Sequence, residues 1–241
     1  QRIHARFMNT GIMATLSGAL VSDGLADGRV ISGVGGQYNF VAMAHQLPTG
    51  RSILMVRAVR DGANPSSNIV MNYGHITIPR HLRDIVITEY GIAELRSKSD
   101  ADVIKALLNI TDSRFQEALL AEAKANGKIE ASYVIPETHR HNFPAALEQK
   151  LSSHRQAKRF PAFPLGSDLT DDEIRLGAAL KAMRKRVSST PKWRLLLGLL
   201  SFNASRIDSN LKPLLERMDL VNPSSMEDKV AQMLLVEALR G

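Results

Sequence analysis

Two short, almost continuous apolar segments constrain the fold of this chain more than any other feature of its sequence. Residues 52–59 read SILMVRAV and residues 84–89 read DIVITE, with too little alternation for a sheet that is covered on one side only. Strands with this pattern are buried on both faces, as in parallel sheets. The sequence therefore predicts an α/β fold with an open, mostly parallel sheet and helices on both faces.

The pattern of elements changes near residue 159. Before this point the sequence predicts strands that alternate with helices: strands at 30–31, 52–59, 68–71, 75–78, 84–89 and 132–135, and helices at 38–45, 92–98, from about 100 and from about 112. Residues 159–167 form a proline-rich connector, and only helices are predicted after it. We expect an α/β domain over residues 1–158 and an all-helical appendage over 168–241, which begins with a capping box at Thr170 and Glu173.

A glycine-rich segment, VISGVGGQYNF at residues 30–40, joins a predicted strand to a predicted helix. Gly33, Gly35 and Gly36 allow positive φ angles and a close approach of the backbone to a ligand. The free N–H groups and the dipole at the start of a helix favour an anion or a developing oxyanion. A tight turn without a ligand explains the same glycines, so this motif alone leaves both interpretations open.

Two stretches in a fixed order resemble the acetyl-CoA hydrolase/transferase family, which includes 4-hydroxybutyrate and butyrate CoA-transferases. Residues 32–40, SGVGGQYNF, are similar to the family's GGQxDF signature, and residues 84–99, DIVITEYGIAELRSKS, are similar to its VVTEYGVAxLxGKS segment. DSRFQE at 112–117 stands where the family has HPDFRE, and Met8-Asn9-Thr10 matches a further family strand weakly. The resemblance covers about residues 5–125 and does not extend to the helical appendage.

The resemblance implies the C-terminal part of an enzyme that hydrolyses acyl-CoA or moves CoA between small carboxylic acids such as acetate. Coenzyme A or acetyl-CoA is then a substrate, with no tightly bound cofactor and no metal. The family's nucleophilic glutamate has no counterpart in this chain. Gly36 matches the family's oxyanion donor, Gly33, Gly35 and Gln37 are the expected CoA-binding residues, and Asn39 replaces the family's aspartate without its charge.

The resemblance and the start of the chain at Gln1 also lead us to expect a missing N-terminal domain of the same protein, without which the chain is inactive. The family is often dimeric, so a homodimer is an open expectation. An alternative function is a non-catalytic module that binds CoA or a partner protein through the basic helical appendage. A turnover assay on the full-length protein separates these two functions.

The composition limits the compartment and the partners that we expect for this protein. The chain has no cysteine, which excludes disulfides and favours a reducing, cytoplasmic compartment. No apolar segment reaches the roughly 20 residues that a membrane span needs, and no membrane partner is expected. A net charge of +7 suits a polyanion. A solvent-exposed basic surface explains this charge as well as a nucleic-acid patch does. Few aromatic residues are available for stacking on bases, which disfavours nucleic acid, and a phosphorylated small molecule such as CoA suits the same charge.

Several other polar residues have two interpretations each. Glu89 follows a strand and is either a general base or a structural acid that binds loop amides, and we favour the second. Tyr90 is expected to pack. A metal at His139 and His141, CoA phosphates at His75 and His81, and phosphate or RNA at Lys181, Arg184, Lys185 and Arg186 are weaker hypotheses than solvent-exposed polar surface.

Overall fold

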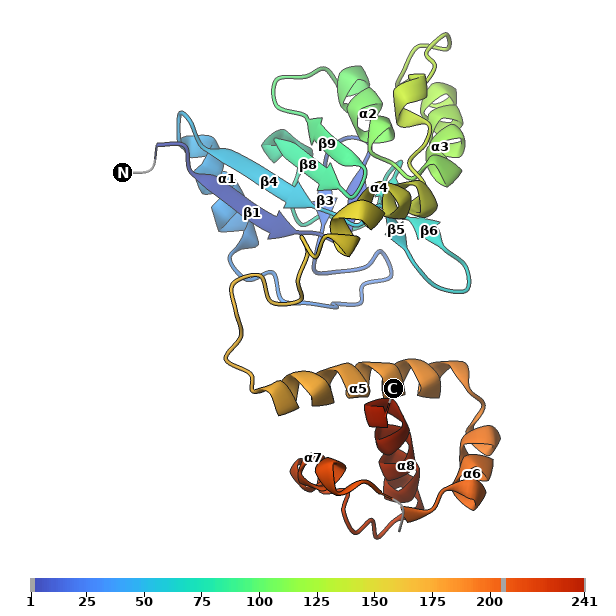
Figure 1. Cartoon of the computed structure of the whole chain (residues 1–241). Helices are drawn as coiled ribbons and strands as arrows, with labels where there is room; N and C mark the ends of the chain where they lie inside the picture. The colour runs from blue at the N-terminus through green and yellow to red at the C-terminus, as the bar shows by residue number, and fades with distance from the viewer. Residues whose placement is uncertain (1–2, 205–206, 241) are drawn as a thin grey trace. The chain divides into compact units, whose positions relative to one another are not determined.

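The computed structural model describes residues 3–204 and 207–240 (Figure 1). The chain divides into two units, residues 1–159 and 160–241, and each unit has its own apolar core. The expected connector at 159–167 falls at the start of the second unit.

The first unit is built on a four-stranded sheet with the order β1-β4-β8-β9. β1 (Arg6–Thr10), β4 (Arg51–Met55) and β8 (Ile85–Thr88) are parallel, and β9 (Gly91–Glu94) returns antiparallel to β8. The two apolar segments of the sequence supply the central strands β4 and β8. The predicted α/β class, with a mostly parallel sheet and a helical appendage, is confirmed.

Shorter elements surround this sheet. A second sheet has the order β3-β2-β7, and β5 and β6 form a hairpin. The bounds are Met13–Thr15 for β2, Leu20–Val21 for β3, Val59–Arg60 for β5, Ser66–Ser67 for β6 and Ile69–Val70 for β7. The helices are α1 (Gln37–Gln46), α2 (Asp100–Asn109), α3 (Ser113–Ala125) and α4 (Pro144–Gln156), with 3₁₀ turns η1 (Arg80–Leu82) and η2 (Glu137–His139).

The predicted helix starts are confirmed by their capping contacts. Ser99 accepts a hydrogen bond from the Asp102 N–H at 3.2 Å where α2 begins. Asp112 accepts one from the Arg114 N–H at 3.0 Å where α3 begins. These contacts satisfy N–H groups that have no partner inside the helix.

The helices that pack most closely on the main sheet share one of its faces. α1 contacts β1 and β4, α2 contacts β9, and Figure 1 shows α1 behind the β1–β4 end. The opposite face bears Met8, Met55 and Ile92, which are 62%, 37% and 66% exposed, and no residue of α4 is buried. The second face, where the sequence led us to expect helices as well, is thus exposed at these three residues, whereas Ile53 and Ile85 on the same face of the central strands are 9% exposed.

The segment expected as a helix over residues 92–98 is instead strand β9 and the loop after it. Its residues favour a helix, but Thr88 pairs with Gly91 across a two-residue turn, and this turn starts a hairpin. Ala93 and Leu95 are then buried, while Ile92 and Glu94 are exposed, which is the period of a strand. Tertiary packing overrides the helix propensity here.

Three other predicted strands are wrong. Val30, 78% exposed, makes only an isolated bridge to Gly24. Ile78 makes only a bridge to Leu20, and residues 132–135 contain no strand. Apolar, β-branched residues caused these errors, because such residues also occur outside sheets: Ile78 is fully buried without belonging to a strand, and Val30 and Val134 are exposed.

The second unit contains α5 (Asp171–Ser189), α6 (Lys192–Ser201), the 3₁₀ turn η4 (Ser209–Leu211), α7 (Lys212–Arg217) and α8 (Met226–Arg240). The capping box of Thr170 and Glu173 at the start of α5 is confirmed. α5 packs against α8, and a cluster that includes Leu176, Leu214 and Leu235 forms the core. Among its described residues this unit has no strand, as predicted.

Leu235→Ala should destabilise the second unit by about 2–5 kcal/mol, because Leu235 is fully buried in that core. The matched variant Leu200→Ala, at a leucine that is 84% exposed, should change stability by less than about 0.5 kcal/mol. Urea unfolding followed by circular dichroism measures both variants. Equal effects of the two substitutions would contradict this assignment of the core.

Candidate functional site

The glycine loop lies at the carboxyl edge of the parallel strands. β1 ends at Thr10, and the buried side chain of Gln37, the first residue of α1, donates a hydrogen bond from Nε2 to the Thr10 carbonyl at 3.1 Å. This bond holds the start of α1 against the end of β1. Ligands of open α/β sheets bind at this edge.

The base of the loop is tied down by Asp23. The Asp23 carbonyl accepts hydrogen bonds from the N–H groups of Ile31, at 2.8 Å, and Ser32, at 3.2 Å. Its carboxylate accepts hydrogen bonds from the Thr77 hydroxyl and from His75 Nε2, and the bond from Thr77 does most to lower the pKa of Asp23. The chain therefore enters the glycine loop from a fixed point.

The loop itself is open and its amides are free. A Cβ at Gly33 or Gly35 would meet no atom within 4 Å, and Gly35 has φ +57°, a conformation that favours glycine. Gly36 is the N-cap of α1, and neither a side-chain cap nor an acidic residue of the first turn occupies this end. Within the described residues, no acceptor binds the N–H groups of Gly33, Gly35 or Gly36.

Two polar side chains stand at the carboxyl ends of β1 and β8, which flank β4 in the sheet. Glu89 follows β8, and its Oε2 accepts a hydrogen bond from the Ala58 N–H at 2.8 Å, which agrees with the structural role that we favoured. Asn9 lies near the end of β1, and its Nδ2 is buried without a partner in the described residues. The sequence analysis did not single out Asn9, although a polar residue at the end of a buried strand is a signal for a site.

Tyr90 packs through a polar network rather than through apolar contacts alone. Its hydroxyl donates to Asp112 Oδ2 at 2.8 Å, and the Arg114 guanidinium donates to both oxygens of the same carboxylate. Burial works against ionisation of Asp112, but the hydrogen bonds from Arg114 and Tyr90 outweigh it and lower the pKa of Asp112. Burial, followed by the bond to Asp112, raises the pKa of Tyr90.

Other sequence candidates are engaged in ion pairs. His141 pairs with Glu137 at 3.0 Å, and within residues 3–204 and 207–240 no group of three His, Asp or Glu side chains is placed to hold a metal ion. Arg186 pairs with Glu237 at 2.5 Å on the helical unit. None of the described helices has the length and apolarity that a membrane crossing requires.

Comparison with known proteins identifies the family. Residues 1–123 match the family described as the acetyl-CoA hydrolase/transferase C-terminal domain. The chain belongs to this family. The matched residues include the GGQ and TEYG segments and make up most of the first unit.

Two curated relatives support this membership. The 4-hydroxybutyrate coenzyme A transferase of Clostridium kluyveri is 30% identical over 119 residues, which cover 48% of this chain and 28% of that protein. The probable butyrate:acetyl-CoA coenzyme A-transferase of Syntrophomonas wolfei is 31% identical over 121 residues, which cover 48% and 27%. The match thus spans little more than a quarter of each relative.

The solved structures that match this chain are less similar to it in sequence than the two curated relatives. RipA from Yersinia pestis is 27% identical, with a TM-score of 0.47 over 52% of this chain and 28% of that one. The 4-hydroxybutyrate CoA-transferase of Porphyromonas gingivalis is 25% identical, with a TM-score of 0.40 over 50% and 26%. Both scores lie below 0.5, so the description of the fold rests on the strands and helices of this chain.

Asp112→Asn should lower the free energy of unfolding by about 1–3 kcal/mol at pH 7, because a buried charge-assisted network is lost. The folded pKa of Asp112 lies below its ordinary value of 3.8. Its ionised form therefore stabilises the fold fully above that pH, and this contribution is lost as the pH falls toward the folded pKa. The difference between wild type and variant should shrink below about pH 4.

Urea unfolding at a series of pH values from 7 to 3 measures this difference. Asp168→Asn, at an exposed carboxylate just after the connector, is the matched control and should leave stability within about 0.5 kcal/mol throughout. A difference between wild type and Asp112→Asn that stays constant with pH would contradict the ionised network.

Proposed function

We propose that this chain is the C-terminal part of an acyl-CoA hydrolase or CoA-transferase that acts on small carboxylates such as acetate. The glycine loop with the first turn of α1 stabilises the oxyanion of the thioester, and a glutamate on another part of the protein is the nucleophile. The observation that carries this proposal is the uncapped N-terminal end of α1, whose loop amides have no partner in the described residues.

The chemistry needs such donors. A glutamate carboxylate attacks the acyl-CoA carbonyl, and collapse of the tetrahedral intermediate expels CoA thiolate and leaves an acyl-glutamyl anhydride. The thiolate then attacks the glutamyl carbonyl, which forms a glutamyl-CoA thioester and releases the first carboxylate. An acceptor carboxylate, or water in a hydrolase, completes the cycle. Each attack places negative charge on a carbonyl oxygen, and fixed N–H groups stabilise that charge without reorganisation.

Each residue of the glycine loop has a role in this proposal. We assign the oxyanion contact to the Gly36 N–H, and contacts with the thioester and the pantetheine arm to Gly33 and Gly35. The side-chain amide nitrogen of Gln37 is bound to the Thr10 carbonyl, so the side-chain oxygen of Gln37 is the group that can accept a hydrogen bond from a substrate amide. The side chain of Asn39 is exposed and has no hydrogen bond in the described residues, so its missing charge affects no contact of the loop.

The same proposal implies which substrates and protein partners the chain has. Acyl-CoA and a carboxylate are substrates, and no tightly bound cofactor is needed for this chemistry. The N-terminal domain that carries the glutamate completes the site, and without it the chain is inactive. We further propose a cytoplasmic protein that can form a homodimer.

A second function, the binding of a partner protein by the helical unit, is favoured by one observation. α6 buries Leu195 against α8 but exposes an apolar stripe on its other side, made of Trp193, Leu196, Leu197 and Leu200 at 47–84% exposure. Contiguous exposed apolar side chains mark interaction surfaces. A full-length protein without CoA turnover would favour this function over the enzyme.

Gly36→Pro removes the proposed donor, and turnover of the full-length enzyme should fall by about 10²–10³-fold. Gly36 has φ −91°, which is about 25° from the value that proline fixes, so the helical signal of the variant has to match wild type before its turnover is compared. Gly36→Ala keeps the N–H but brings a Cβ to 3.1 Å from the Phe40 ring, and an intermediate loss is expected. Steady-state kinetics with acetyl-CoA, together with circular dichroism, measures both effects.

Gly177→Ala on α5 is the matched control, because a Cβ there meets no atom within 4 Å. This variant should keep full turnover. Wild-type turnover in a folded Gly36→Pro enzyme would remove the Gly36 N–H from the mechanism.

A further inference from the structure

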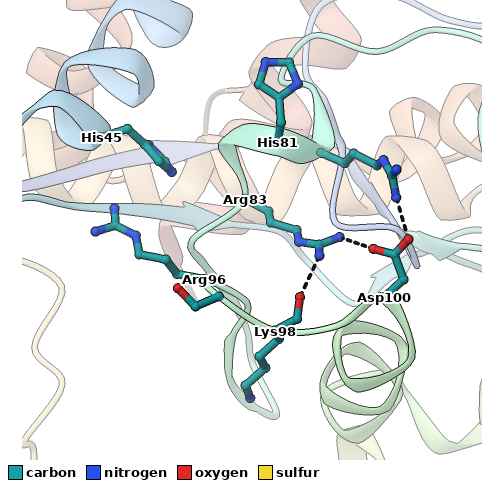
Figure 2. Close-up of a pocket in the computed structure, with 8 residues that line it drawn as sticks. His45, His81, Arg83, Arg96, Lys98 and Asp100 are labelled. Carbon is teal, nitrogen blue, oxygen red and sulfur yellow. Dashed lines mark hydrogen bonds and ion pairs between the residues drawn. The ribbon is translucent and has the colours of Figure 1, made fainter.

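A basic cleft lies at the opposite end of α1 from the glycine loop (Figure 2). It has a volume of about 490 Å³ and is lined by His45 at the end of α1, Arg80 and His81 of η1, Arg83, and the loop residues Arg96, Ser97 and Lys98, with Asp100 at the start of α2. This volume lies in the range of small-molecule sites. Three segments that are distant in the sequence meet here.

The charge of the cleft is strongly positive. Four permanent cations face one carboxylate, that of Asp100. Asp100 is already bound by Arg83, at 2.9 Å, and by Arg80, at 2.6 Å. Arg96 is held by the buried Asp84 at 2.8 Å. Lys98 has no ion-pair partner among the described residues, so its charge is available to a ligand.

Two nitrogens of residues that line the cleft are buried without a partner in the described residues. His45 donates from Nδ1 to the Val41 carbonyl at 3.0 Å, which leaves its Nε2, the acceptor nitrogen of a neutral ring, buried without a partner in the described residues. Arg96 Nε is buried without one as well. Figure 2 shows the side chains of His45 and Arg96 pointing toward one another. Buried polar atoms of this kind are rare in folded proteins and mark places where a ligand or water completes the contacts.

The wall of the cleft is fixed rather than loose. Arg83 donates to Asp100, to the Lys98 carbonyl at 2.9 Å and to the Ser17 carbonyl at 3.0 Å, and its side chain is only 15% exposed. Ser97 has φ +62°, an uncommon conformation for a residue with a Cβ. The turn that presents Lys98 is therefore held in one shape by its surroundings.

We propose that this cleft binds a phosphate-bearing small molecule, with His45 and Arg96 on its inner side and the flexible Lys98 side chain closing over the phosphate. Guanidinium and ammonium groups are the donors that bind phosphate in proteins. The phosphate has two sources: the nucleotide end of CoA, which rests on the proposed function, or a separate phosphorylated metabolite. The site is distinct from the glycine loop, because α1 lies between them.

Isothermal titration of the full 241-residue chain with inorganic phosphate, ADP and CoA tests the proposal. The wild-type chain should bind at least one of these probes. Lys98→Gln should weaken that binding several-fold and Lys98→Glu by about tenfold or more, because a charge-assisted contact is lost and then reversed. No binding of any probe at millimolar concentration would overturn the proposal.

Lys128→Glu is the matched control, since this exposed lysine has no ion pair in the described residues and follows α3. It should leave binding unchanged. An equal loss of binding in both glutamate variants would show that only the net charge of the protein matters, and it would overturn the proposed site. Loss of CoA and ADP binding together in Lys98→Glu assigns the cleft to the nucleotide end of CoA. Loss of ADP or phosphate binding with CoA binding intact assigns it to a separate ligand, and this binding assay does not depend on turnover.

Discussion

The buried carboxylate of Asp84 is the interaction on which the amino edge of the sheet depends. Its side chain is fully buried and accepts hydrogen bonds from the Ser52 N–H at 2.7 Å, from Arg51 and from Arg96. A buried charge without such partners costs several kcal/mol, so the strands that supply them are held together. β4, β8 and the loop after β9 are thereby fixed, and Arg96 is placed in the basic cleft as a consequence.

Helix α1 connects this amino edge of the sheet to its carboxyl edge. Gln37 ties its first turn to the end of β1, and His45 ends its last turn at the cleft. Ten residues of helix span about 15 Å. The glycine loop and the basic cleft are therefore positioned by one rigid element, at opposite edges of the same sheet.

The sequence was sufficient to predict those elements whose signals lie in neighbouring residues. Capping side chains at Ser99, Asp112 and Thr170 located three helices, and the glycine motif located α1. β9 was missed because a helix-forming composition yields to the hairpin that starts at Thr88. The sequence analysis considered His81 as a phosphate contact, and His81 lines the basic cleft. The partner of Gln37 and the other residues of the cleft could not be predicted from the sequence, since both depend on segments that meet only after the sheet has formed.

The electrostatics of the two ends of α1 differ in a way that suits two kinds of negative charge. At its start a positive dipole end of about half a charge is left uncapped, which matches a charge that exists only during a reaction. At the cleft, the C-terminal end of α1 and the N-terminal end of α2, whose first residue is Asp100, carry partial charges of opposite sign. The four side-chain cations then decide the potential, and a permanent charge such as a phosphate needs cations of this kind rather than main-chain amides.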